Sequence, residues 1–289
     1  MAHVQSPVHH GYPRMSSIAL LLRSVAAIMF SSVAATSLAQ DIHAKELPRS
    51  ERFKPTDVVL YQYEACPFCN KVKAFMDYYH IPYNIVEVNP INKKEIKWSD
   101  YKKVPILTVD GEQMVDSSDV IDKLIKRIDP DYDLDGDEEK KWRGWVDNHL
   151  VHILSPNIYR TTSEALESFD YITNSRVKRN FSFTERLLAK YAGAAAMYFV
   201  SKKLKKRHNI IDERAALYKA ADTWVDALKG RKFLGGSNPN LADLAVFGVL
   251  RPIRHLTSGR DMVEHTRIGE WYSQMESVVG QSSSIKAQK

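Results

Sequence analysis

The only two cysteines of this 289-residue chain stand three positions apart, in Cys66-Pro67-Phe68-Cys69. Apolar, β-prone residues 58–61 precede this motif, and a helical pattern at residues 71–79 follows it. A strand, a tight turn, Cys-x-x-Cys and a helix together form the layout of a thioredoxin-type redox site. This layout constrains the fold strongly, because it places a thiol at the start of a helix beside a buried strand.

The position of Cys66 explains its expected chemistry. The start of a helix has unpaired backbone N–H groups and the positive end of the macrodipole, and both favour an anion. We therefore expect the pKa of the Cys66 thiol to fall from about 8.5, which leaves more thiolate at neutral pH. Pro67 suits the first helical turn, because its missing N–H would have no partner there.

A zinc site and a structural disulfide are the two other interpretations of the cysteine pair. Zinc usually takes four protein ligands, whereas one Cys-x-x-Cys supplies two, and His80 lies at the far end of the predicted helix. A disulfide with this spacing at a helix start is strained. The cysteine count does not separate these cases, but the flanking strand and helix favour a reactive thiol site without a metal.

Length and composition predict a globular protein of two domains. Hydrophobic residues make up 44% of the chain and charged residues 26%, and both values are ordinary. The net charge is +6 and the pI is about 9.1. We find no nucleic-acid-binding module and expect no nucleic-acid partner, so this charge is weak evidence for an anionic partner or a membrane surface.

The first forty residues differ from the rest, since they contain no Asp or Glu. Residues 16–39 are an almost unbroken run of apolar, Ala and Ser residues, interrupted by Arg23. A transit peptide, a secretory signal and a membrane anchor remain alternatives. We expect residues 1–49 to be an organelle-directed segment and linker that can stay as an anchor. The expected location is a mitochondrial membrane; Golgi or secretory membranes, a plastid, or a soluble processed form are the alternatives.

Residues 50–129 predict an α/β thioredoxin-like domain. Asp110-Gly111 is a strong hairpin signal between two short apolar runs. The expected order is β-α-β followed by β-β-α. The predicted elements are strands at 58–63, 83–88, 104–109 and 112–115, and helices at 69–79 and 116–128.

Residues 130–289 predict an all-α domain, because no strand pattern is convincing after Val115. Gly193-Ala194-Ala195-Ala196 would permit close approach of another helix. Asn240 and Asp243 form the pattern of a capping box, in which each side chain bonds to the other's backbone N–H. The predicted helices cover residues 140–154, 183–206, 213–228, 240–250 and 262–279.

Several segments carry a resemblance to known proteins. The stretch from Tyr63 to Cys69 is similar to the glutaredoxin active-site turn. Longer stretches between Val58 and Trp271 resemble the type 2 membrane-associated prostaglandin E synthase family of the glutathione transferase superfamily. These include Lys103-Val104-Pro105-Ile106-Leu107, Asp116-Ser117-Ser118, Leu150-Val151-His152-Ile153-Leu154-Ser155-Pro156-Asn157 and Pro239-Asn240-Leu241-Ala242-Asp243.

The resemblance implies a glutathione site in the first domain. Cys66 would be the reactive thiol, Tyr63 its hydrogen-bonding neighbour and Cys69 a second thiol. Val104 would pair its backbone with the tripeptide, beside a cis peptide bond at Pro105. Asp116 and Ser117 would hold the γ-glutamyl end, since a helix N-terminus offers N–H groups to a carboxylate and Asp116 can accept from an ammonium.

The resemblance also implies a haem or substrate pocket in the second domain, because the family is described as binding haem through glutathione. His152 and Ser155 match positions that line this pocket, and Arg207 matches a basic residue near a haem propionate. Lys203 replaces an arginine, which keeps the charge and loses the bidentate fork.

The implied function is a glutathione-dependent isomerase that converts the prostaglandin endoperoxide to prostaglandin E. The intact cysteine pair leaves a glutaredoxin-like or glutathione-transferase-like thiol enzyme with another substrate as the alternative, since a disulfide reductase uses its second thiol to resolve a mixed disulfide. A glutathione or haem carrier without turnover is a third possibility. A homodimer acting on a lipid or disulfide substrate is the expected assembly.

Overall fold

A computed structural model describes residues 53–90, 92–170 and 183–285. The chain divides into two compact units, Met1–Leu47 and Pro48–Lys289, and all described residues belong to the second. The predicted targeting segment at residues 16–39 therefore lies outside the described residues. Within the ranges that the structure describes, no helix is both long and apolar enough to cross a membrane.

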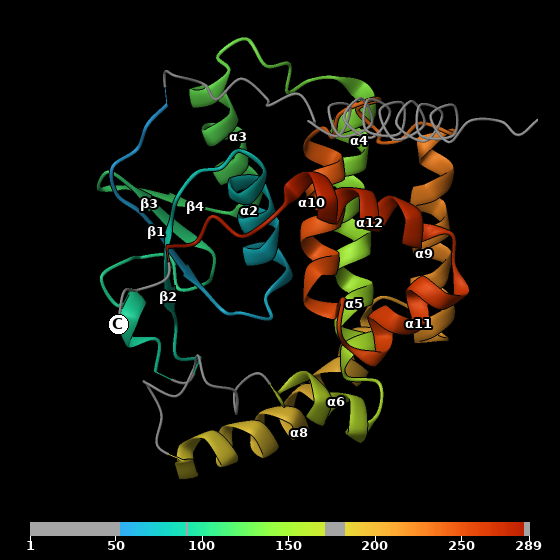
Figure 1. Cartoon of the computed structure of the whole chain (residues 1–289). Helices are drawn as coiled ribbons and strands as arrows, with labels where there is room; N and C mark the ends of the chain where they lie inside the picture. The colour runs from blue at the N-terminus through green and yellow to red at the C-terminus, as the bar shows by residue number, and fades with distance from the viewer. Residues whose placement is uncertain (1–52, 91, 171–182, 286–289) are drawn as a thin grey trace, which may run out of the picture. The chain divides into compact units, whose positions relative to one another are not determined.

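A four-stranded mixed sheet forms the first lobe of the second unit (Figure 1). Its order is β2-β1-β3-β4, with β1 and β2 parallel and the other neighbours antiparallel. The Asp110-Gly111 turn joins the last two strands, both residues having positive φ. The predicted thioredoxin-like order is confirmed. The strands are β1 (Val58–Gln62), β2 (Asn84–Glu87), β3 (Ile106–Val109) and β4 (Glu112–Val115).

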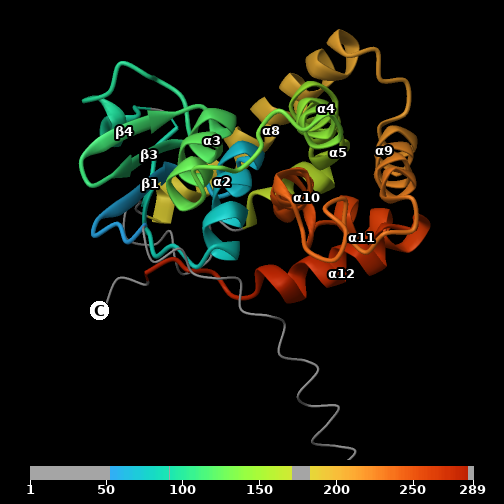
Figure 2. The same cartoon turned by 90° about the horizontal axis from the view of Figure 1, so that it is seen from above.

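Two helices, α2 (Pro67–Tyr78) and α3 (Ser117–Ile128), pack side by side against this sheet (Figure 2). A short 3₁₀ turn, η1 (Lys94–Ile96), follows β2. Helix α2 begins two residues earlier than expected. Strand β2 is shorter than expected because Tyr83 pairs instead with the C-terminal segment, donating its N–H to the Ser283 carbonyl.

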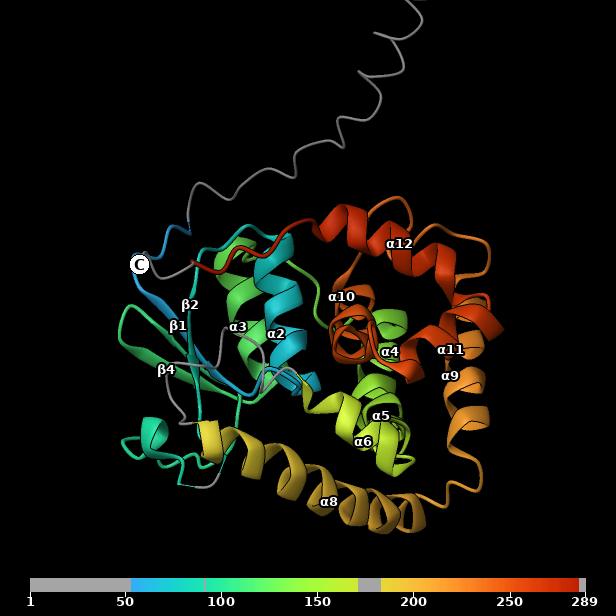
Figure 3. The ribbon, with the colours of Figure 1, turned by 60° about the horizontal axis from the view of Figure 1, so that its bottom comes forward.

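The second lobe is helical, as predicted (Figure 3). Its first helix runs from α4 (Asp137–Trp145) through a π-helical turn, η2 (Val146–Leu150), into α5 (Val151–Ile158). The remaining elements are α6 (Thr162–Ser168), α8 (Phe183–Arg207), α9 (Glu213–Leu228), α10 (Leu241–Leu250), η3 (Arg251–Ile253), α11 (Thr257–His265) and α12 (Ile268–Val279).

Two helix predictions in this lobe need correction. The single helix expected at 262–279 is two helices, α11 and α12, because Thr266 is extended and the Arg267 N–H donates to Asp222 of α9. Helix α6 was not predicted. Its cap is local, since the Thr161 hydroxyl accepts from the Glu164 N–H at 3.2 Å.

Helix α10 joins the two lobes, since it is buried along its whole length and packs on α2. Gly248 allows this contact: a Cβ there would lie 2.5 Å from the Lys71 Cα atom. The predicted capping box of Asn240 and Asp243 is confirmed. The buried Asp243 carboxylate also accepts from the Trp271 indole at 3.2 Å.

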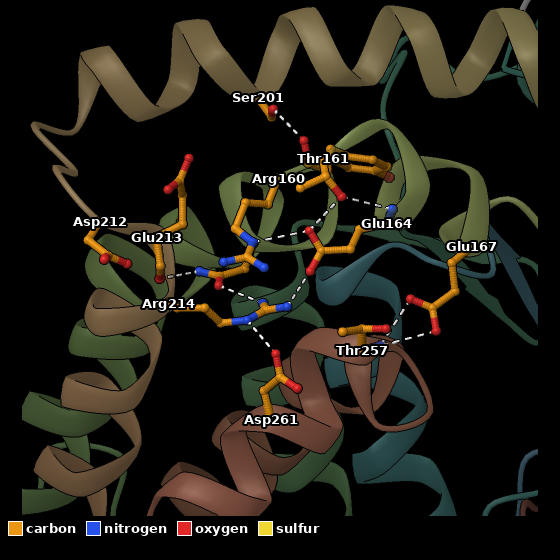
Figure 4. Close-up of polar contacts among 12 residues, drawn as sticks. Arg160, Thr161, Glu164, Glu167, Ser201, Asp212, Glu213, Arg214, Thr257 and Asp261 are labelled. Carbon is orange, nitrogen blue, oxygen red and sulfur yellow. Dashed lines mark hydrogen bonds and ion pairs between the residues drawn. The ribbon is translucent and has the colours of Figure 1, made fainter.

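A buried polar network fixes the end of α5 (Figure 4). The Arg214 guanidinium donates to Glu164 and Asp261, and to the Asn157 side chain at 2.9 Å. Arg214 and Glu164 are both buried, so their charges are paired rather than solvated. Close helix approach at Gly193 is also confirmed, because a Cβ there would meet the Phe169 ring at 2.7 Å.

Candidate active site

Strand register places three predicted site segments at one edge of the sheet. Tyr61 of β1 pairs with Ile106 of β3, which pairs in turn with Val115 of β4. The chain leaves β1 towards Cys66 at this edge, enters β3 from Pro105, and leaves β4 towards Asp116. Segments that are distant in sequence therefore meet beside one another, and we call Cys66, Val104 and Asp116 the dithiol edge.

Cys66 caps the N-terminus of α2 and is half-buried. Its N–H donates to the Tyr63 carbonyl at 3.0 Å, which closes the turn before the helix. The Asn70 side-chain amide donates to the carbonyls of Cys66 and Glu64, at 3.0 and 2.8 Å. The sulfur is thus held where the backbone N–H groups of Phe68 and Cys69 point towards it.

The two thiols have opposite electrostatic environments. A hydrogen bond from the Cys69 thiol, together with the N–H groups of Cys69 and Phe68, lowers the pKa of Cys66 against the opposing effect of burial. Burial raises the pKa of Cys69 well above its ordinary value, and its hydrogen bond to Cys66 adds to this rise. Cys66 is therefore the more acidic of the two thiols, the direction that the helix-start argument predicted, and Cys69 is the weaker acid that donates to it.

A carboxylate that sequence reasoning missed lies beneath the active-site turn. Glu87 of β2 accepts from the Glu64 N–H at 2.8 Å and from the Gln62 amide at 3.1 Å. Burial raises the pKa of Glu87 to about 7, and its negative charge in turn raises the pKa of Cys66. The parallel register of Gln62 with Glu87 explains the contact, and no local sequence motif predicts it.

Two tyrosines line this edge. The Tyr63 phenol packs beside a small cluster of Val88, Ile96 and Ile106, while its carbonyl bonds to Cys66. Burial raises the pKa of Tyr63, and the nearby sulfurs add to the rise. Tyr101 was not predicted. Burial raises the pKa of Tyr101 as well, and Asp116 and both cysteines add to the rise. The Tyr101 hydroxyl therefore interacts electrostatically with both ends of the dithiol edge.

The other predicted glutathione residues have the backbone geometry that they need. The Val104–Pro105 peptide bond is cis, as expected. Asp116 caps α3, and its carboxylate accepts from the Ser118 N–H at 2.9 Å. Asp116 is exposed, whereas Ser117 is buried. The dithiol edge thus presents an exposed carboxyl group at one end and a thiol of lowered pKa at the other.

A buried ion pair ties this edge to the helical lobe. The Lys71 ammonium of α2 lies 2.6 Å from Asp147 and donates to the Ser118 hydroxyl at 2.8 Å. Burial lowers the pKa of Lys71, and Asp147 opposes that change. From the other lobe, burial raises the pKa of Tyr159 at the end of α5, and its proximity to Cys66 adds to the rise.

No hydrogen bond, ion pair or ring contact of the described residues joins the haem or substrate residues predicted on α5 and α8 to the dithiol edge. The His152 ring stacks on His208 with centroids 4.2 Å apart, and burial lowers the pKa of His152. His152 precedes Tyr159 by two helical turns, about 10 Å along the axis. Lys203 and Arg207 are exposed on α8, and no contact of the described residues joins either to His152 or Ser155.

These four side chains do not form a haem cradle in this arrangement. The His152 ring, which is expected to line the pocket, stacks on His208. The two cations lie on the exposed side of α8 rather than at the α5 contact. We therefore derive no chemical step through haem.

A thioredoxin-like lobe joined to a helical lobe, with the thiolate near their junction, defines a protein of the glutathione transferase class. Family models agree: residues 60–131 match the glutathione S-transferase N-terminal domain and residues 181–273 its C-terminal domain. A solved structure of human glutathione transferase theta-2, in complex with glutathione and an unknown ligand, superposes with a TM-score of 0.52. That likeness has 18% identity and covers 77% of this chain and 82% of the other.

Two curated relatives narrow the class. Prostaglandin E synthase 2 of Danio rerio is 44% identical over 83% of this chain and 76% of its own length. Prostaglandin E synthase 2 of Mus musculus is 39% identical over 96% of this chain and 85% of its own length. The chain belongs to the prostaglandin E synthase 2 family.

Proposed function

We propose that this protein is a glutathione-dependent isomerase that converts a prostaglandin endoperoxide to prostaglandin E, with Cys66 as the attacking thiolate. The observation that carries the proposal is the position of the Cys66 sulfur, whose pKa is lowered by a hydrogen bond from the Cys69 thiol and by the first N–H groups of α2. The names of the relatives supply the substrate class.

The proposed reaction returns the thiol unchanged. The Cys66 sulfur attacks one endoperoxide oxygen, so that an S–O bond forms and the O–O bond breaks. The other oxygen takes the electron pair and a proton and becomes a hydroxyl. A base then removes the hydrogen from the carbon that bears the S–O group. The C–H electrons form the ketone as the S–O bond breaks and releases the thiolate.

Glutathione would occupy the dithiol edge. The backbone of Val104, which lies outside the paired strands, would pair with the tripeptide next to the cis bond at Pro105. Asp116 would accept from the γ-glutamyl ammonium, and the α3 N-terminus at Ser117 would bind the carboxylate. Tyr63 would border the thiol through its backbone contact with Cys66.

Thiol–disulfide exchange is the second candidate function, and the Cys69 thiol favours it. In exchange, the Cys66 sulfur bonds to one sulfur of a substrate disulfide and displaces the other sulfur as a thiolate. Cys69, deprotonated, then attacks the mixed disulfide and displaces the second substrate sulfur, which leaves an oxidised pair for glutathione to reduce. An isomerase needs only the Cys66 sulfur as a nucleophile, with a hydrogen-bond donor at position 69.

Separate Cys66→Ser and Cys69→Ser variants test both functions. We expect Cys66→Ser to lose turnover of the endoperoxide and of a model disulfide, and Cys69→Ser to lose only the disulfide reaction. Full endoperoxide turnover by Cys66→Ser would assign the attack to the glutathione sulfur and overturn the role given to Cys66.

We also propose that the protein is a homodimer on a mitochondrial membrane, attached through residues 16–39. The support is the acid-free, apolar character of that segment. Fractionation of organelles, with and without residues 1–47, would test the location. An unchanged distribution without the segment would contradict it.

A further inference from the structure

The outer side of α8 gathers exposed apolar side chains. Phe199 is 66% exposed, and Ile211, just beyond the helix, is 93% exposed. Figures 1 and 3 show α8 at the border of the described helices, with none of them beyond it. We define the α8 face as its exposed residues Tyr191, Ala192, Ala195, Ala196, Phe199, Val200, Lys202, Lys203, Lys206 and Arg207, together with Ile211.

The α8 face contains no acidic side chain, and of its cations only Lys202 lies near a carboxylate of the described residues, 3.9 Å from Glu213. No Asp or Glu occurs between Lys190 and Ile211. Lys205 pairs with Glu213 at 2.9 Å and points back into the protein. Among the described residues, by contrast, Lys203, Lys206 and Arg207 have no ion-pair partner. Cations at the end of a helix suit its dipole, but that role does not require exposed aromatic and aliphatic neighbours.

The combination of exposed apolar side chains and cations indicates what binds the α8 face. In a symmetric dimer the same patch would face itself, and the second copy would bring no acidic side chain to these cations, since the α8 face contains no Asp or Glu. A bilayer with anionic headgroups satisfies both parts of the face, because exposed aromatic and aliphatic side chains enter the headgroup boundary while lysines and arginines lie at the charged surface. Long cationic side chains can also extend from an apolar surface to the headgroups.

We propose that the α8 face is a peripheral membrane-binding surface that lies on anionic lipid headgroups, separate from any anchoring by residues 16–39. Phe199, Val200 and Ile211 enter the boundary between headgroups and acyl chains. Lys203, Lys206 and Arg207 contact the phosphate and carboxylate groups. The site depends on the fold, because the α5 and α6 contacts determine which side of α8 is outermost.

Lysine labelling of the full-length protein tests the surface even if the N-terminal segment is inserted. The protein is bound to phosphatidylcholine vesicles that contain about one third phosphatidylserine and treated with an amine-reactive reagent. Mass spectrometry then follows Lys203 and Lys206, with the exposed Lys219 and Lys232 as internal controls. We expect at least about tenfold slower labelling of Lys203 and Lys206, with the controls unchanged.

Matched variants give a second measurement. Lys203→Glu/Lys206→Glu should lower partitioning to these vesicles relative to Lys219→Glu/Lys232→Glu, which changes the net charge equally. The expected difference is about 25-fold or more, at about fivefold per lost cation. Equal labelling of all four lysines on vesicles would overturn the proposal. Protection without vesicles that grows with protein concentration would assign the face to a second copy and would also overturn it.

Discussion

The dithiol edge and the α5–α8 contact both hold predicted site residues, Cys66 from its place at a helix start and the others from the resemblance, and the two sets are arranged differently. At the dithiol edge, three segments meet because β1, β3 and β4 pair in one register. At the α5–α8 contact, His152 stacks on His208 while Lys203 and Arg207 are exposed. A strand register fixes which chain ends meet, whereas two helices can touch with any of several faces. The arrangement of the dithiol edge therefore follows from strand topology, whereas the haem or substrate residues on α5 and α8 rest on the resemblance alone.

The largest expected effect is on endoperoxide turnover, and it distinguishes the dithiol edge from the α5–α8 contact. Cys66→Ser should lower endoperoxide turnover about a thousandfold, because it removes the attacking thiolate. The matched change at the other region, His152→Ala, should alter turnover by less than about threefold, because among the described residues the His152 ring stacks on His208 and makes no polar contact with the dithiol edge. Steady-state kinetics with saturating glutathione measures both. Similar losses of turnover in Cys66→Ser and His152→Ala would contradict the different roles given to the two regions.

The junction that holds the dithiol edge is expected to be sensitive to one added carbon. Gly248→Ala would place a Cβ 2.5 Å from the Lys71 Cα atom and 2.9 Å from the Asn70 carbonyl oxygen. Both are backbone atoms of α2, so the variant should lose about 2–3 kcal/mol of unfolding free energy. Gly144→Ala on α4, with nothing within 4 Å of its Cβ, is the control. Chemical denaturation measures the difference, and equal midpoints would show that α10 can move away freely.

The pH dependence of the dithiol edge should follow Glu87. Its folded pKa of about 7 lies above the unfolded value, so ionisation opposes folding. Stability contributed by the protonated form is present at low pH and is lost as pH rises from about 4.5 to about 7. Glu87→Gln should therefore be about 3 kcal/mol more stable relative to the unmodified protein at pH 8 than at pH 4. The substitution should also lower the pKa of Cys66, because an anion is removed.

Urea denaturation across this pH range, paired with ultraviolet absorbance of the thiolate, measures both effects of Glu87→Gln. Glu95→Gln is a suitable control, since Glu95 bonds to the Asn89 N–H instead of the active-site turn. If the unfolding free energies of Glu87→Gln and of the unmodified protein change in parallel with pH, Glu87 does not titrate in this pH range and the prediction is wrong.

The smallest effect concerns glutathione at the other end of the edge. Asp116→Asn keeps an oxygen that caps α3 and tolerates the positive φ, but loses the charge. It should weaken glutathione binding about tenfold, whereas Arg207→Ala on α8 should change it less than about twofold. Isothermal titration calorimetry on the two variants decides whether the tripeptide lies at the dithiol edge. A larger loss of glutathione affinity in Arg207→Ala would instead place the tripeptide at α8.

Much of the thioredoxin-like lobe was predictable because its signals are local. Cys66 at a helix start, the Asp110-Gly111 turn and the residues around Pro105 each mark a structure within a few positions. The capping box of Asn240 and Asp243 is equally local, and so is the Thr161–Glu164 cap of α6, which was overlooked although its spacing marks a helix start.

The remaining features depend on contacts between distant residues. Glu87 reaches the active-site turn through strand pairing, and Tyr101 lies in the field of Asp116 and the cysteines through the fold of a loop. The break between α11 and α12 depends on Asp222 of another helix. No spacing within the sequence announces these contacts. The same reason explains why the haem set could not be judged before the faces of α5 and α8 were known.

Titration of the two thiols in the full-length protein tests the central claim most directly. Alkylation rates of Cys66 and Cys69, followed by mass spectrometry across a pH series, should give a pKa for Cys66 below that of a free cysteine and one for Cys69 well above it. Two thiols that react alike, with the pKa of an ordinary cysteine, would contradict the account.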